Sequence, residues 1–102
     1  MSAGNTGTDL SARARSVLAA LVQEYIDRGT PVSSRWLAGH GGFGLSSATV
    51  RHILVSLEEA GLVWQPHTSS GRVPTDLGYR SFVDLLLEHR LAARSTSAVE
   101  AR

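Results

Sequence analysis

Glycine and proline divide the 102-residue chain into short segments, and this division restricts the possible folds more than any other feature. Apolar residues recur at spacings of three and four between Ser11, a candidate N-cap, and Gly29, a candidate C-terminal stop. Pro31 then prevents this helix from continuing. The glycine-rich stretch 39–44 and Gly61 are the next interruptions. Three short helices therefore fit before Gly61.

The second and third of these helices have recognisable caps. The second is predicted to begin at Ser33 or Ser34 and to end near Gly39. The third is capped by Ser46 and stops at Gly61. Its spacing directs four apolar residues inward: Val50, Ile53, Leu54 and Leu57.

Two β-prone runs, 62–65 and 72–74, flank a turn-rich tip and predict a small hairpin. A fourth helix opens at Thr75-Asp76 and is predicted to end near Leu91. Its expected inward residues are Tyr79, Phe82, Val83 and Leu86. The order helix, helix, helix, hairpin, helix indicates a mainly α winged helix-turn-helix.

Size and composition allow one domain, at 10.9 kDa with 42% hydrophobic residues and a formal net charge of +1. We expect a flexible lead-in at residues 1–9, the domain at 10–92 and a flexible tail at 93–102. No stretch has the roughly 18 to 20 apolar residues that a membrane helix needs. The absence of cysteine excludes disulfides and fits a reducing cytoplasm.

The sequence does not predict a catalytic centre. Residues 39–44 match G-x-G-x-x-G, but a helix precedes them where a dinucleotide site needs a strand, so a turn between helices is favoured. The four histidines lack metal-ligand spacing, and no catalytic motif occurs. Glu58 and Glu59 are interpreted as part of a solvated helix surface. The prediction is a protein that is not an enzyme and needs no cofactor or metal.

Charge is distributed unevenly along this nearly neutral chain. All ten basic residues are arginine, a bias that arises as easily from GC-rich coding as from phosphate binding. Their placement is more informative, because no Asp or Glu occurs between Arg28 and Leu57. The middle of the chain is therefore basic.

The outer face of the third helix is predicted to bind DNA. At about 100° per residue, the positions opposite the inward residues are Ala48, His52, Val55 and Glu59, flanked by Thr49, Arg51 and Ser56. Small side chains at one end would let the backbone approach a groove, and Arg51 and His52 could then reach phosphates or base edges. An ordinary exposed helix is the alternative.

Two further regions join this candidate interface. Helix N-termini bind phosphate through unpaired amides, and two of them are marked here by hydroxyl and basic residues: Ser33, Ser34, Arg35, Ser46 and Ser47. Simple capping is the alternative, and it accounts for one serine at each helix start. The hairpin tip forms a candidate wing that carries His67, Thr68, Ser69, Ser70, Gly71 and Arg72. Arg72 is the expected side chain to enter a minor groove, although flexible polar tips are also common without such a role.

The residues of this tip and its surroundings resemble the HrcA family, the heat-inducible transcription repressors of bacteria. The resemblance rests on residues 66–80 and continues upstream through 44–51 and 57–62, covering roughly residues 10–84. It implies a repressor of chaperone genes that binds the inverted-repeat CIRCE operator as double-stranded DNA and is modulated by the chaperonin GroEL. By position, Ser47, Ala48, Thr49 and Arg51 fall on the family's recognition helix and His67 to Arg72 on its wing.

The sequence departs from the family pattern at three positions. His52 and Ile53 replace the usual Asn and acidic residue, and Gly41 replaces a common aromatic. The family's proteins are also several times longer. A divergent stand-alone regulator with a different operator therefore remains open beside a repressor fragment.

The fourth helix has a wider apolar arc than one small core requires. We expect some of its leucines to be exposed and to allow weak self-association, as a homodimer, through Leu85, Leu87 and Leu91. A competing function is a winged helix that binds protein through this arc and through Trp36 and Trp64.

Overall fold

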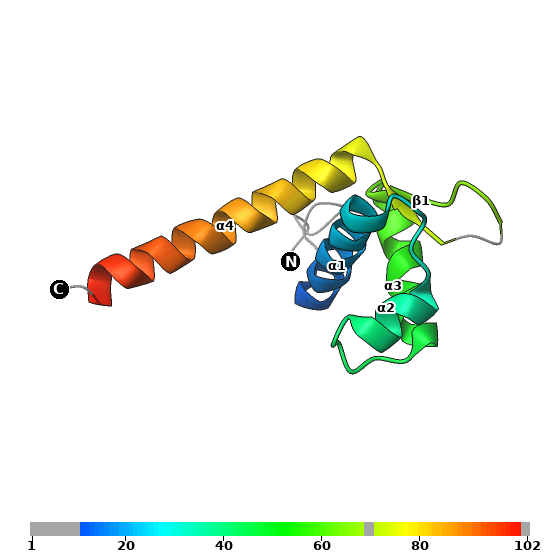
Figure 1. Cartoon of the computed structure of the whole chain (residues 1–102), viewed down its shortest axis with the longest axis horizontal. Coiled ribbons are helices and arrows are strands. Elements are labelled where there is room, and N and C mark those ends of the chain that lie inside the picture. The colour runs from blue at the N-terminus through cyan, green and yellow to red at the C-terminus, as the bar shows by residue number, and fades with distance from the viewer. Residues whose placement is uncertain (1–10, 69–70, 101–102) are drawn as a thin grey trace, which may run out of the picture.

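The computed structural model describes residues 11–68 and 71–100, with side chains up to Arg94. Three helices come first: α1 (Ala12–Arg28), α2 (Ser34–His40) and α3 (Ser47–Glu59). The antiparallel strands β1 (Val63–Trp64) and β2 (Val73–Pro74) follow, and α4 (Asp76–Glu100) comes last. Figure 1 shows a body of three helices and a hairpin from which α4 extends. The predicted mainly α, winged-helix order is confirmed. The predicted lead-in at residues 1–9 lies outside the described residues.

Serine side chains begin the first three helices as predicted. The Oγ atoms of Ser11, Ser33 and Ser46 accept hydrogen bonds from the backbone N–H three residues ahead, at 3.1, 3.0 and 3.1 Å. Each satisfies one of the amides that a helix start leaves without a partner, and such a cap contributes about 1 kcal/mol. Gly29, with a φ of 74°, ends α1 in the left-handed conformation.

The core lies where α1, α2, α3 and the hairpin meet. Nine side chains are fully buried there: Val17, Leu18, Leu21, Val22, Leu37, Val50, Leu54, Leu57 and Val63. Burial of each contributes about 1.5 to 3 kcal/mol, so this cluster fixes the orientation of α3. Ile53, predicted to face inward, is only half-buried at the edge of the cluster.

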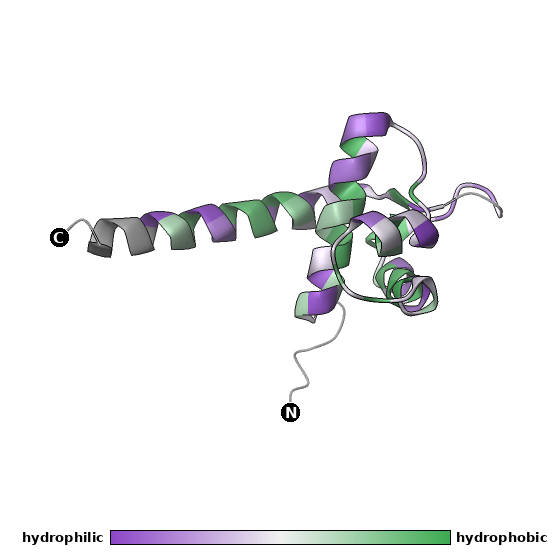
Figure 2. Cartoon of the chain, turned by 60° about the horizontal axis from the view of Figure 1, so that its bottom comes forward, coloured by the Kyte–Doolittle hydropathy of each residue, from purple (hydrophilic) through white to green (hydrophobic). Residues whose placement is uncertain are grey.

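Helix α4 differs from the prediction in its end and in its buried face. It continues to Glu100 instead of ending near Leu91, because no glycine or proline follows Leu91 and the alanines there favour the helix. Only its beginning packs on the body, where Phe82 is buried. Val83 and Leu86 are therefore exposed, and the prediction that they face inward is wrong. Figure 2 shows hydrophobic residues along the part of α4 that leaves the body.

The hairpin is shorter than predicted and has an additional neighbour. Val63 pairs with Pro74 and Trp64 pairs with Val73, so each strand has two residues. An isolated antiparallel bridge joins Val32, just before α2, to Arg72. The base of the wing is thereby connected to the segment that leads into α2.

Candidate nucleic-acid interface

Helix α3 presents the face that the sequence predicted. Ala48, Arg51, His52 and Val55 are exposed, as is Glu59 farther along. The opposite side of the helix is fully buried through Val50, Leu54 and Leu57. The predicted orientation of α3 is therefore confirmed.

The exposed face of α3 is basic and begins with small side chains. No carboxylate occurs between Ser46 and Val55. Ala48 leaves space for the helix backbone to approach a surface. The Arg51 guanidinium offers hydrogen-bond donors, and the His52 ring nitrogens can donate or accept. This combination suits the negative backbone and base edges of a duplex.

Serine hydroxyl groups cap the N-termini of α2 and α3. Ser46 Oγ donates a hydrogen bond to Thr49 Oγ1 at 3.1 Å in addition to accepting one from the Thr49 amide. Because Ser33 and Ser46 are the N-caps, Ser34 and Ser47 become the first residues of their helices. Arg35 follows on α2 and is exposed.

The wing comprises residues 66–72, of which the structure describes 66–68 and 71–72. Figure 1 shows the chain that follows β1 extending away from the helices. His67 and Thr68 are exposed, and the Thr68 carbonyl accepts a hydrogen bond from Gln65 Nε2 at 3.0 Å. Ser69 and Ser70 lie outside the described residues. His67 and Thr68 are thus the exposed side chains in the described part of the wing.

Arg72 is held by an ion pair at the base of the wing. Its Nε donates to Glu58 Oε1 at 3.1 Å, and its side chain is 13% exposed against 40% for Glu58. Contact of Arg72 with a minor groove stays a prediction. Glu58, interpreted from the sequence as part of a solvated helix surface, instead forms an ion pair with the wing base. The sequence alone does not reveal this pair, because its partners are distant along the chain and no local pattern fixes the angle between hairpin and helix.

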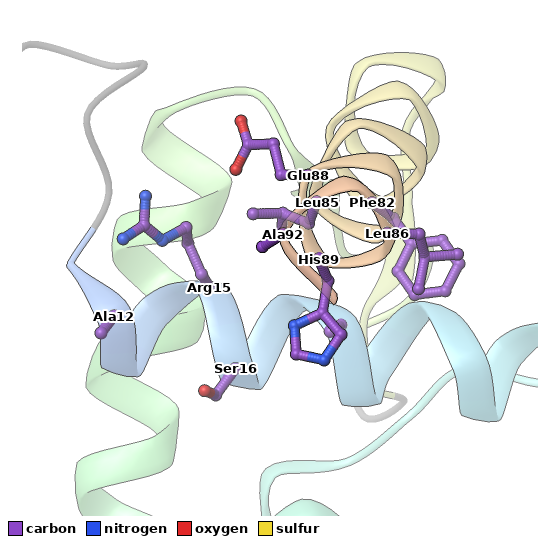
Figure 3. Close-up of a pocket in the computed structure, with 10 residues that line it drawn as sticks. Ala12, Arg15, Ser16, Phe82, Leu85, Leu86, Glu88, His89 and Ala92 are labelled. Carbon is purple, nitrogen blue, oxygen red and sulfur yellow. The ribbon is translucent and has the colours of Figure 1, made fainter. Parts of the chain in front are cut away.

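A groove with a volume of about 590 Å³ lies between α1 and α4. Figure 3 shows Arg15 and Ser16 on its α1 side and Glu88 and His89 on its α4 side, with His89 directed towards α1. The remaining lining is mostly apolar and includes Ala19, Phe82, Leu85 and Leu86. A groove with this lining is better suited to binding an apolar segment of a partner than to catalysing a reaction.

The residues expected to support self-association differ in exposure. Leu87 and Leu91 are 51% and 63% exposed, whereas Leu85 lines the groove and is half-buried. Of the two tryptophans, Trp64 is exposed, and Trp36 stacks on His40 with ring centroids 4.6 Å apart. The candidate protein-binding residues therefore differ in solvent exposure and do not form one uniformly exposed patch.

Residues 11–68 and 71–100 contain no cluster of three or more histidine and carboxylate groups arranged to hold a metal ion. None of their helices combines the length and apolar character that crossing a membrane requires.

The helix order, the exposed α3 and the hairpin wing define a winged helix-turn-helix domain. No family model matches the chain. The heat-inducible transcription repressor HrcA of Chlorobium phaeobacteroides (strain BS1) is 52% identical over 79 residues, which are 78% of this chain and 22% of that protein. HrcA of Sorangium cellulosum (strain So ce56) is 55% identical over 82 residues, or 80% and 24%.

A solved structure shares the fold as well as the sequence. It is described as "Crystal structure of a hypothetical protein at 2.2 A resolution" and aligns with a TM-score of 0.74 at 43% identity, over 78% of this chain and 25% of that one. The chain is thus homologous to the N-terminal part of HrcA heat-inducible transcription repressors. It spans about a quarter of their length or less.

Proposed function

We propose that this domain binds double-stranded DNA through α3 and the wing, as the DNA-binding part of an HrcA-like repressor of heat-shock genes. The observation that carries the proposal is the orientation of α3. Its acid-free side with Arg51 and His52 is exposed while the other side forms the core. Homology to transcription repressors supports this function over an enzymatic one.

The position of the wing supports the same interface. Arg51 and Glu58 are seven residues apart, so they lie within about 20° of each other around α3 and about 10 Å apart along it. Because Glu58 binds Arg72, the base of the wing attaches at the edge of α3 that carries Arg51. A duplex lying against Arg51 would therefore meet the wing as well.

Each group has a distinct role in the proposed complex. Arg51 reads a base edge in the major groove, and His52 and Val55 contact neighbouring positions. Backbone phosphates are bound by the helix starts and by the wing, through Ser33, Ser34, Arg35, Ser46, Ser47, His67, Thr68, Ser69, Ser70 and Gly71. Thr49 flanks the outer face of α3, and Arg72 is the wing side chain proposed to reach a minor groove. Ala48 allows the close approach of the helix.

The operator is proposed to be an inverted repeat related to CIRCE, and repression is proposed to occur by occlusion of the promoter. Two copies would place their α3 helices in successive major grooves, about 34 to 36 Å or a multiple of this apart. Such a repressor would act in the cytoplasm, and the resemblance to the HrcA family implies modulation by GroEL. His52 and Ile53 are the positions at which operator preference would differ from other members of the family.

Self-association through α4 would supply the second copy. Val83, Leu87 and Leu91 are exposed at spacings of four and so share one face of the helix. In an antiparallel pair centred on Leu87, Asp84 of one copy faces Arg90 of the other, which adds charge complementarity. Sedimentation should show weak dimers that Leu87→Glu abolishes, and a strict monomer at high concentration would remove this part of the proposal.

A titration of labelled duplexes tests the function. With few basic residues per copy, we expect micromolar or weaker binding at physiological salt, tighter for an inverted repeat than for a scrambled duplex. The logarithm of the affinity should fall linearly with the logarithm of salt concentration. Equal affinity for both duplexes with no salt dependence would favour the competing function, protein binding through Trp64 and the α4 leucines.

A further inference from the structure

Arg72 joins three parts of the domain at one point. Its backbone N–H donates to Val32 O at 2.8 Å, and its carbonyl accepts from Val32 N at 2.9 Å. Its side chain reaches Glu58 on the last turn of α3. Arg72 is therefore connected to the segment before α2 and to α3, and its own chain continues directly into β2.

The chain on either side of this contact has little freedom to move. A Cβ on Gly71 would lie 2.0 Å from Val32 O and 2.7 Å from Ser33 N, so only glycine permits this approach. Ser33 is in turn the N-cap of α2. A shift of the wing base would thus disturb the start of α2 as well as the pair with Glu58.

The negative charge of Glu58 is unusual at this edge of α3. It stands at the edge of a helix whose preceding residues, from Ser46 to Leu57, include no acidic side chain. An unpaired carboxylate beside a proposed DNA interface would repel phosphates. Its pairing with the largely buried Arg72 compensates the charge and directs the carboxylate to the wing.

We propose that Glu58 is a positioning residue that fixes the wing relative to α3 through Arg72, without itself contacting DNA. This inference rests on the proposed function. The bridge between Val32 and Arg72 holds the backbone of the wing base, and the ion pair sets its angle to α3. The distance between base contacts by α3 and backbone contacts by the wing is thereby fixed before DNA arrives.

Neighbouring alanine variants provide the test. Glu58→Ala and Glu59→Ala each remove one carboxylate from the same turn of α3 and introduce a good helix former. Glu58→Ala loses the charged hydrogen bond to Arg72 and should bind the inverted-repeat duplex about tenfold more weakly than the wild-type protein. Glu59→Ala should bind this duplex as tightly as the wild type or more tightly. A hydroxyl-radical footprint should keep the α3 protection and lose the flanking wing protection only in Glu58→Ala. Equal affinities and footprints in the two variants would overturn the proposal.

A measurement without DNA separates this inference from the proposed function. Amide hydrogen exchange at Val32 and Arg72 should be faster in Glu58→Ala than in wild-type protein and unchanged in Glu59→Ala. Unchanged exchange in both variants would overturn the positioning role even if DNA binds. Faster exchange in a protein that binds no duplex would instead overturn the proposed function and leave the role of Glu58 in holding the wing base intact.

Reversal of the pair adds a rescue experiment. The single variants Glu58→Arg and Arg72→Glu bring like charges together and should both speed exchange at the bridge. The double variant E58R/R72E restores opposite charges and should recover slow exchange. A double variant that exchanges as fast as the singles would contradict a direct interaction between the two side chains.

Discussion

Gly71→Ala is expected to destabilise the domain by about 1 to 3 kcal/mol. The new Cβ would lie 2.0 Å from Val32 O, so the two backbones must separate by about 1 Å or more to reach van der Waals contact. The two bridge hydrogen bonds of 2.8 and 2.9 Å would then exceed the usual range. Each contributes about 0.5 to 1.5 kcal/mol, which gives the total.

Thermal unfolding followed by circular dichroism measures this effect. For a domain of this size each kcal/mol corresponds to about 4 to 8 °C in Tm, so Gly71→Ala should lower the Tm by at least about 4 °C. Gly39→Ala is the matched control, because its Cβ would meet no atom within 4 Å and alanine favours the helix α2. It should raise stability by up to about 1 kcal/mol. Equal Tm values for Gly71→Ala and wild type would refute the close contact between Gly71 and Val32.

Three further substitutions have defined outcomes. Ser46→Ala removes the N-cap of α3 and should reduce the free energy of unfolding by about 1 kcal/mol in urea titrations, whereas an unchanged value would mean that water replaces the cap. Thr75→Val removes the 2.6 Å hydrogen bond to the Gly61 carbonyl and should cost about 1 to 2 kcal/mol by the same assay. Arg51→Ala should weaken duplex binding by about 1 to 3 kcal/mol and relax the choice of base at one position, while uniform weakening across sequences would assign Arg51 to a phosphate.

Local patterns in the sequence were sufficient to predict the helices and the exposed face of α3. The serine caps, the glycine at the end of α1 and the apolar spacing act within one or two turns, so they can be read directly from the chain. The same spacing oriented Arg51 and His52 away from the core. Residues 62–65 and 72–74 also predicted the hairpin, although the strands are shorter.

Contacts between distant segments were not predictable in the same way. The pair of Glu58 with Arg72 and the bridge from Val32 depend on the angle at which the hairpin leaves α3, which tertiary packing determines. The prediction of which α4 side chains are buried failed for a related reason. Apolar spacing indicates that Val83 and Leu86 share a face with Phe82, but it does not indicate how far the body extends along the helix.

The central claim, that α3 and the wing together bind duplex DNA, is tested most directly by NMR mapping of backbone amides during titration with an inverted-repeat duplex. The chain of 102 residues is small enough for each amide signal to be followed. The signals of Ala48, Arg51 and His52 and those of the wing should shift together. Shifts confined to α4 and the groove beside α1, with α3 unaffected, would contradict the account.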